Sequence, residues 1–330
     1  MQPEIRVRRP RPDEAGAVAD LLNAHSVADI GVPDTTNEEV AASWDRPGRE
    51  PEDVMVAEQA GEMVGYLEVD AEPPWTGIRI DGYVRLDRAG RGIGTALLEI
   101  GERRARMLAL RAPPGARVAA FNGAWHESPA SMFLQGHGYT WARAFWRMAI
   151  TMAERPPAPA LPDGVAIRAV VPGRDEGPLH AAVDEAFGDH WEHRPVAFDR
   201  WLYQHRTHPG FDPGLWLMAV DGDEVAGGLI CHRLTTEDPD CGWIDEVAVR
   251  RPWRRRGVAL ALLHHAFGAL YARGIRKAAL TVDSTSPTGA GSLYERAGMQ
   301  VQRRIDVYSK VLVPGNEETN GDGRPVTPKG

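Results

Sequence analysis

The sequence has few cysteines and no long apolar run. Its 330 residues include two cysteines, Cys231 and Cys241, which form no CxxC pair and are too few to hold a fold of this size together by disulfides. No stretch approaches the roughly 20 consecutive apolar residues that span a bilayer. The basic N-terminus is not followed by the apolar segment of a secretory signal. We therefore expect a cytoplasmic protein with no membrane partner.

An excess of positive charge is also missing. The net charge is −8 and the isoelectric point is about 5.8, which argues against general nucleic-acid binding and suits a cationic acceptor such as an amine. A hydrophobic fraction of 43% with 25% charged residues is typical of a globular protein. The length is sufficient for two domains that each bury a core.

The chain repeats itself at a nearly constant offset. Ile5-Arg6 recurs as Ile167-Arg168, and Arg91-Gly92-Ile93 recurs as Arg256-Gly257-Val258. A proline-dense stretch at 154–163 lies between the copies and predicts a stiff linker. We predict an N-terminal domain at 1–155, a C-terminal domain at 156–313, and a disordered tail at 314–330 that lacks aromatic residues.

Both copies show the same order of predicted elements. A short strand and a helix come first, then a variable region, a hairpin, a strand that enters a Gly/Arg-rich loop, a long amphipathic helix, a strand and a short helix. This order predicts an α/β fold with a mixed sheet. Apart from the hairpins, the predicted ranges are 5–9, 13–25, 78–86, 95–108, 117–121 and 130–135, and 165–170, 175–187, 242–249, 259–273, 278–282 and 289–297.

The Gly/Arg-rich loop of the second copy suits an anionic ligand. Three consecutive arginines, Arg254, Arg255 and Arg256, precede Gly257 at the start of the long helix. A helix N-terminus offers unpaired N–H groups and a partial positive charge, and small residues let the main chain approach a pyrophosphate. The pattern is neither GxGxxG nor GxxxxGK[ST], so dinucleotide-binding and P-loop interpretations are disfavoured. An isolated motif of this kind could also be a solvated turn.

The same loop resembles the acyl-CoA-binding motif [RQ]-x-x-G-x-[GA] of the GNAT superfamily, with Arg254, Gly257 and Ala259 at the fixed positions. The chain as a whole resembles two tandem GNAT-type domains. This resemblance implies an N-acetyltransferase that uses acetyl-CoA as cosubstrate and a small-molecule amine or a peptide amine as acceptor. It also implies the CoA-binding residues Val247, Val249, Arg254, Arg255, Arg256, Gly257, Val258 and Ala259.

The resemblance further implies two catalytic residues. Tyr294, in Leu-Tyr-Glu before a Gly-Met turn, matches the tyrosine that protonates the departing CoA thiolate; it could instead pack on the sheet. Glu246 matches the family's general base, although it could instead form an ion pair with an arginine. Strand alternation predicts that Asp245 points to the opposite face. The backbone N–H of Val247 would hold the oxyanion.

The N-terminal copy departs from this pattern. Ala89 stands where the second copy has Arg254, and Leu134 stands where it has Tyr294. A second CoA-binding loop is implied at Arg91, Gly92 and Gly94, so this half would bind CoA without turnover or serve as a scaffold. An alternative for the whole chain is a non-catalytic acyl-CoA-binding regulatory or interaction protein. The degenerate first half favours that alternative, and the retained second half argues against it.

Four histidines precede the second hairpin: His190, His193, His205 and His208. HxxH spacing without cysteine and without a clear carboxylate ligand is a weak metal motif, so we predict no metal. The segment falls where GNAT proteins form the acceptor-side wall. We therefore expect its histidines and aromatic residues to shape an acceptor pocket.

Overall fold

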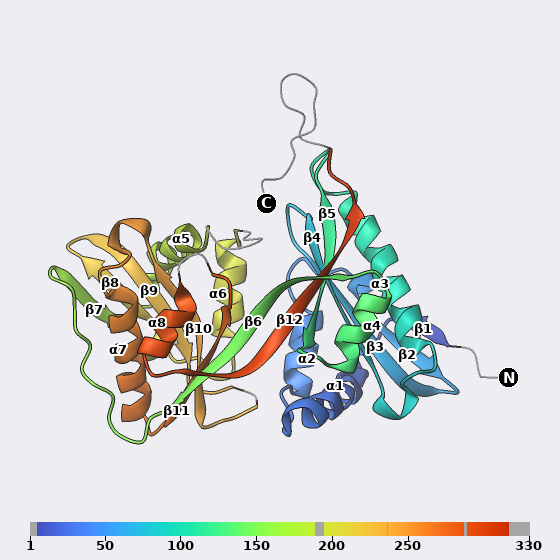
Figure 1. Ribbon diagram of the computed structural model, residues 1–330, viewed down its shortest axis with the longest axis horizontal. Coiled ribbons are helices and arrows are strands. Elements are labelled where there is room, and N and C mark those ends of the chain that lie inside the picture. Colours follow the sequence, from blue (N-terminus) through green and yellow to red (C-terminus); the bar gives the residue numbers. More distant parts are fainter. Residues whose placement is uncertain (1–4, 189–194, 236, 287–288, 317–330) are drawn as a thin grey trace. The chain divides into compact units, whose positions relative to one another are not determined.

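The computed structural model describes residues 5–188, 195–235, 237–286 and 289–316 (Figure 1). The chain forms two compact units. The N-terminal unit comprises the described residues up to Ala142 together with those from Val307 onward, and the C-terminal unit comprises Arg143–Asp306. Within the described ranges, no helix is both long enough and apolar enough to cross a membrane.

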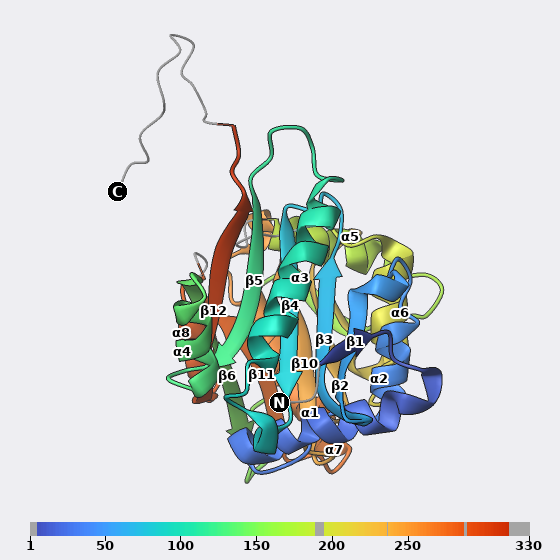
Figure 2. The same ribbon diagram turned by 90° about the vertical axis from the view of Figure 1, so that its right-hand side faces the viewer.

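The N-terminal unit is built on a mixed sheet with the strand order β1-β2-β3-β4-β5-β12. β4 and β5 run parallel, whereas β1 to β4 pair antiparallel. Figure 2 shows α3 lying along one face of this sheet, where it contacts β3 and β4. The elements are β1 (Arg6–Arg8), η1 (Pro12–Glu14), α1 (Ala15–Ile30), α2 (Asn37–Trp44), η2 (Pro51–Asp53), β2 (Val54–Gln59), β3 (Glu62–Ala71), β4 (Gly77–Val84), η3 (Leu86–Arg88), α3 (Ile93–Ala109), β5 (Val118–Trp125), α4 (Pro129–Gly136) and the last part of β12 (Gln300–Val313).

The C-terminal unit repeats this plan with the strand order β6-β11-β10-β9-β8-β7. β10 and β11 run parallel, and the other neighbours with a described register pair antiparallel. α5 and α7 both contact β9 and β10. The elements are β6 (Thr140–Thr151), β7 (Val165–Ala169), α5 (Glu176–Phe187), α6 (Phe198–Arg206), η4 (Pro213–Leu215), β8 (Leu217–Asp221), β9 (Glu224–His232), β10 (Cys241–Val249), η5 (Arg251–Trp253), α7 (Val258–Ala272), β11 (Lys277–Asp283) and α8 (Ala290–Arg296).

Each sheet is covered by helices on both faces. In β8, Leu217 and Ala219 belong to the core that contains α7, whereas Met218 between them belongs to the core that contains α5 and α6. In β2, Val56 packs with α1 and Ala57 packs with α3. Successive strand residues point to opposite faces, so apolar residues at adjacent positions require a helix layer on each side. The structure confirms the predicted mixed α/β fold.

Two long strands complete the sheets. Residues 145–151 of β6 pair antiparallel with β11, and the end of β12 borders β5. The prediction that a short helix closes each half is therefore wrong, because a long strand follows α4 and another follows α8. The compact units divide at Ala142/Arg143 and at Asp306/Val307, and not at the predicted 155/156, because β6 and β12 each run across a boundary. The predicted tail beyond Asn316 lies outside the described residues.

Candidate active site

The loop between β10 and α7 contains two residues in the left-handed backbone region. Gly257, the N-cap of α7, has a φ of 89°, and Arg255 has a φ of 61°. Glycine adopts this conformation without steric cost. A Cβ atom at Gly257 would meet no atom within 4 Å, so the backbone conformation accounts for the glycine and the space before the helix stays open. The first N–H groups of α7 lack intrahelical acceptors and, with the helix dipole, favour an anion here.

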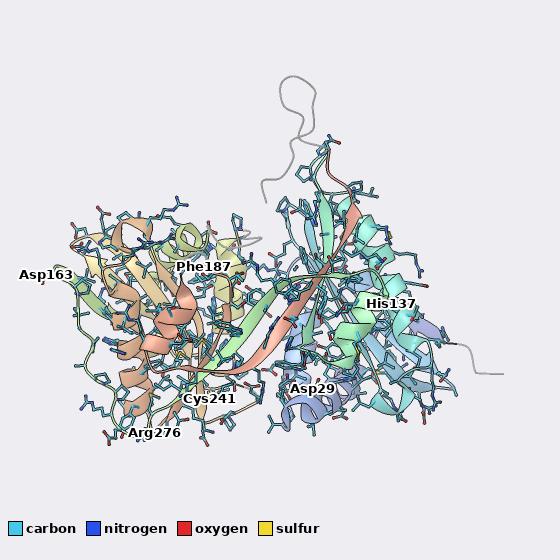
Figure 3. The ribbon with its side chains drawn as sticks, viewed as in Figure 1. Asp29, His137, Asp163, Phe187, Cys241 and Arg276 are labelled. Carbon is cyan, nitrogen blue, oxygen red and sulfur yellow. The ribbon has the colours of Figure 1, made fainter. Side chains whose placement is uncertain are left out.

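A cavity of about 570 Å³ opens beside this loop. Segments of β10, β11, α7 and α8 line it, together with Phe187 at the end of α5, which is labelled in Figure 3. Ser286, which follows β11, also lines it. The structure brings most of the sequence-predicted site residues to this one cavity: Val247, Val249, Arg254, Arg255, Gly257, Val258, Ala259 and Tyr294.

The arginines of the loop have different surroundings. Arg254 lines the cavity and also donates hydrogen bonds to the carbonyl oxygens of Val249, at 3.1 Å, and Ala186, at 3.0 Å. Arg254 therefore ties the loop to the end of β10 and to α5. Arg256 instead donates to the carbonyl oxygen of Asp163 at 3.4 Å and does not line the cavity. Its side chain is directed toward the segment that precedes β7.

Tyr294 lies on α8, and its phenolic hydroxyl group can donate a proton. The residue is 8% exposed and borders the same cavity as the loop. Burial raises the pKa of the Tyr294 phenol to about 12, because the charged phenolate is poorly solvated there. The phenol therefore stays protonated through neutral and mildly alkaline pH. A protonated phenolic hydroxyl can donate to a departing anion.

Glu246 and Asp245 sit at a bulge in β10. The register with β9 shifts between Ile244 and Glu246, so strand alternation is interrupted at Asp245. As a result both carboxylates approach one imidazole: His205 Nδ1 lies 3.2 Å from Asp245 Oδ2, and His205 Nε2 lies 3.5 Å from Glu246 Oε1. The prediction that Asp245 points away from Glu246 is wrong because of this bulge. Asp245 lines the cavity, whereas Glu246 does not.

The Glu246 carboxyl group is held by a hydrogen-bond donor of a neighbouring side chain. The indole Nε1 of Trp201 donates to both carboxylate oxygens at 3.2 Å. Burial works to lower the pKa of His205, but the Asp245 and Glu246 carboxylates outweigh it and raise that pKa to about 9. Burial likewise works to raise the pKa of Asp245, but the neighbouring imidazoles of His205 and His232 hold it well below its usual range. The two neighbouring carboxyl groups therefore favour the protonated form of the His205 imidazole.

The structure describes two of the four histidines that the sequence brought forward. His190 and His193 lie outside the described residues. His205 is buried on α6, and His208 follows that helix. Burial and the neighbouring His232 lower the pKa of His208 to about 4. Sequence reasoning missed His232 at the end of β9, where a histidine that ends an apolar strand was the available signal.

The N-terminal unit repeats the loop without the tyrosine. Gly92 is the N-cap of α3 with a φ of 81°, and a Cβ there would also meet no atom within 4 Å. Arg91 is exposed, and a Cβ at Gly94 would approach the ring of Phe133 at 3.5 Å. Leu134 is a buried core residue of α4. The N-terminal unit therefore retains the glycine loop but has a leucine in place of the tyrosine that is predicted to act as the acid.

A carboxyl group also occupies the N-terminal equivalent of the Glu246 position. In the β3/β4 ladder, Asp81 lies opposite Glu68. Glu246 lies opposite Ile230 at the corresponding position of the β9/β10 ladder. Arg79 Nε lies 2.8 Å from Asp81, and burial raises the Asp81 pKa. Sequence reasoning missed Asp81, although the offset that relates the two loops also relates Asp81 to Glu246.

Comparison with known proteins shows similarity to acetyltransferases. A family model described as the acetyltransferase (GNAT) family matches residues 178–299. The chain is 30% identical over 307 residues to a mycothiol acetyltransferase from Thermobispora bispora, covering 89% of this chain and 95% of the relative. It is also 30% identical to a mycothiol acetyltransferase from Salinispora arenicola, covering 89% and 93% of the two chains.

Solved structures extend the likeness to the fold. A GCN5-related N-acetyltransferase from Sphaerobacter thermophilus superposes with a TM-score of 0.79 at 38% identity, covering 96% of this chain and 98% of that chain. A tandem GNAT protein from the clavulanic acid biosynthesis pathway superposes with a TM-score of 0.68, covering 95% and 100%. At 17% identity the second likeness concerns the fold alone.

A helix N-terminus that would favour a pyrophosphate lies beside a cavity with a protonated phenol, an arrangement that suits an acyl-CoA-dependent transferase. With relatives at this identity along nearly the full chain, the protein belongs to the GNAT acetyltransferase family and is an N-acetyltransferase of the tandem type. The family uses acetyl-CoA. The residues present fit this cosubstrate, since the space that a Cβ at Gly257 would enter is free for its phosphates.

Proposed function

We propose that the C-terminal unit transfers an acetyl group directly from acetyl-CoA to an amine bound beside Asp245 and Glu246. The observation that carries this proposal is the single cavity shared by the Gly257 loop and Tyr294. When bound, acetyl-CoA supplies a thioester carbonyl that is open to attack by an amine. Val258 and Ala259 would hold its pyrophosphate at the start of α7, and Arg254 and Arg255 would add positive charge.

The proton movements are assigned to two residues. Glu246 takes the proton of the attacking amine, and because it lies outside the cavity lining it acts through a water molecule. Tyr294, which burial keeps protonated, delivers a proton to the CoA sulfur. The backbone N–H of Val247 stabilises the negative charge that develops on the carbonyl oxygen. These roles require a ternary complex and no covalent enzyme intermediate.

We assign the acceptor to the class that the relatives' names indicate. Relatives matched over most of the chain are named mycothiol acetyltransferases. A complete C-terminal copy behind a degenerate N-terminal one also resembles mycothiol synthase, whose acceptor is the cysteinyl amine of a pseudodisaccharide precursor. The N-terminal unit, with Leu134 in place of the tyrosine, is assigned a non-catalytic role in which Arg91, Gly92 and Gly94 form a second CoA-binding loop.

The test is transfer of label from acetyl-CoA to a panel of amines. We expect the cysteinyl precursor of mycothiol to become acetylated on nitrogen, and its N-blocked analogue to remain unlabelled. An analogue with serine in place of cysteine measures the contribution of the thiol. Labelling of other amines but not the precursor would contradict the acceptor assignment. Acetyl-CoA binding without transfer to any amine would contradict the assigned chemistry.

A further inference from the structure

Three side chains of the types that bind metals in proteins converge near Glu246. His205 on α6, His232 at the end of β9 and Asp245 at the β10 bulge each present one ligand atom, and these atoms lie within 4.8 Å of one another. The three residues come from separate elements of one unit. His205 and His232 are 5% and 0% exposed, so the two imidazoles lie in the interior. A histidine pair with one carboxylate is a donor set that zinc uses in proteins.

His232 provides an independent indication of a ligand. Neither of its ring nitrogens has a hydrogen-bond partner within the described part of the chain, although the residue has no exposed surface. Its Nε2 atom lies 3.6 Å from Asp245 Oδ2, which is longer than a hydrogen bond. Leaving a buried polar group unsatisfied costs about 1–3 kcal/mol, so such groups nearly always have a partner.

The spacing of the ligand atoms suits a metal ion between them. Zinc binds nitrogen and carboxylate oxygen at about 2.0–2.2 Å in tetrahedral geometry, which sets neighbouring ligand atoms about 3.3 Å apart. The two separations that involve Asp245 Oδ2 are 3.2 Å, to His205 Nδ1, and 3.6 Å, to His232 Nε2. Small side-chain adjustments would bring all three atoms to an ion.

The surroundings of His205 complete the arrangement. A histidine that binds metal through one ring nitrogen usually donates its other N–H to a carboxylate or carbonyl, which fixes the ring orientation. With Nδ1 toward Asp245, the Nε2 atom of His205 faces Glu246 Oε1 at 3.5 Å. Trp201 holds that same carboxylate through its indole N–H. Glu246 would therefore orient the metal-binding histidine while it serves the acetyl transfer.

We propose that His205, His232 and Asp245 bind one Zn²⁺ ion. Three protein ligands leave one coordination position for water or for a donor atom of the acceptor. The ion would link α6, β9 and β10 and fix the β10 bulge on which Asp245 and Glu246 lie. This site could not be predicted from the sequence, because only His205 belongs to the histidine-rich segment before the second hairpin.

Zinc binding by the full chain tests this proposal without acetyl-CoA or acceptor. After chelator treatment, zinc is titrated against a fluorescent chelator of known affinity. We expect one ion per chain, and His232→Gln should weaken binding by about 100-fold or more, since loss of even an outer-shell partner costs 10–100-fold. His208→Gln is the matched control. Its ring stacks on His232 with centroids 4.0 Å apart, but it is not one of the three ligands.

A second measurement guards against a misfolded variant. Co²⁺ added to the metal-free wild-type protein should give the visible absorption of a tetrahedral nitrogen and oxygen site, and one equivalent of Zn²⁺ should remove it. Asp245→Asn, with its fold verified by circular dichroism, should lose this spectrum. Wild-type protein that binds no zinc, or equal weakening by His208→Gln and His232→Gln, would overturn the proposal. Since no transfer is measured, failure here leaves the acetyl-transfer assignment untouched.

Discussion

The two units share a loop and differ in the side chains that face it. Gly92 and Gly257 have φ values of 81° and 89°, each at the start of a long helix, and a Cβ atom placed on either glycine would meet no atom within 4 Å. Beside the loop, however, Leu134 is a buried core residue and Tyr294 lines a cavity. The glycine in the left-handed region before the long helix is therefore common to both units. The proposed chemistry depends on a few side chains placed around it.

The largest expected effect compares the two glycines directly. Gly257→Glu should abolish turnover, because it adds bulk and negative charge where the pyrophosphate is proposed to bind. Gly92→Glu should leave most turnover intact, and it matches the first variant in backbone strain because both positions have a similar positive φ. Steady-state rates are measured with the fold verified for both variants. Equal loss in the two would contradict the assignment of the chemistry to the C-terminal unit.

The second prediction concerns the tyrosine that the N-terminal unit lacks. Tyr294→Phe should lower kcat by about 10²–10⁴ and leave acetyl-CoA affinity nearly unchanged, since it removes the proton donor and keeps the ring. The loss should shrink as pH rises, because a thiol with a pKa near 8.5 then needs less protonation on leaving. Tyr271→Phe on α7 is the control, since Tyr271 does not line the cavity. A wild-type rate in Tyr294→Phe, where chemistry limits turnover, would return Tyr294 to a packing role.

The third prediction concerns thermal protection by acetyl-CoA, for which we expect a smaller effect than for turnover. At 100 times its dissociation constant, a ligand of the folded state adds roughly 2.7 kcal/mol of stability. We expect this thermal protection in the wild type and in Gly92→Glu, and its loss in Gly257→Glu. Protection that persists in Gly257→Glu and disappears in Gly92→Glu would locate the principal site in the N-terminal unit.

The smallest expected effect concerns the free energy of unfolding at acid pH. Hydrogen bonding by Arg8, which outweighs burial, lowers the Glu14 pKa from 4.5 to about 2. This depressed pKa contributes stability above about pH 4.5 that is lost as pH falls toward 2. The contribution should be about 1–3 kcal/mol. Glu14→Gln should therefore flatten the pH dependence of the unfolding free energy between pH 5 and 2, as followed by urea titration.

The C-terminal unit provides the matching carboxylate for this experiment. Arg168 and Arg174 hold the pKa of Asp175 well below its usual range. Asp175→Asn should accordingly flatten the acid limb as well, with its effect reaching to lower pH than that of Glu14→Gln. An unchanged acid limb in both variants would show that these ion pairs form equally in the unfolded chain.

The loop and Tyr294 could be predicted from the sequence because their patterns are local. Arg254, Gly257 and Ala259 fall within one turn-to-helix segment, and Tyr294 lies in a short helix before a glycine turn. The surroundings of Glu246 were not accessible in this way. The β10 bulge depends on pairing with β9, and His205 reaches it from a different element.

The pairing of β6 and β12 with strands of the other sequence copy could not be predicted, for a related reason. β6 pairs with β11, whose residues lie more than 100 positions later, and a repeat alignment assigns each copy only its own neighbours. The predicted boundary at 155/156 follows the repeat in the sequence, whereas the compact units divide at Ala142/Arg143 and at Asp306/Val307. Nothing in the local pattern of either strand specifies its partner.

The pairing of β6 with β11 and of β12 with β5 also determines what is lost when one sequence copy is deleted. Deleting the N-terminal copy at the predicted boundary would take β6 away from β11 and leave that edge of the C-terminal sheet unpaired, and an open edge invites aggregation. Deleting the C-terminal copy would likewise remove the strand that borders β5. Each sequence copy therefore supplies a strand that pairs within the sheet of the other unit, whatever catalytic side chains that copy carries.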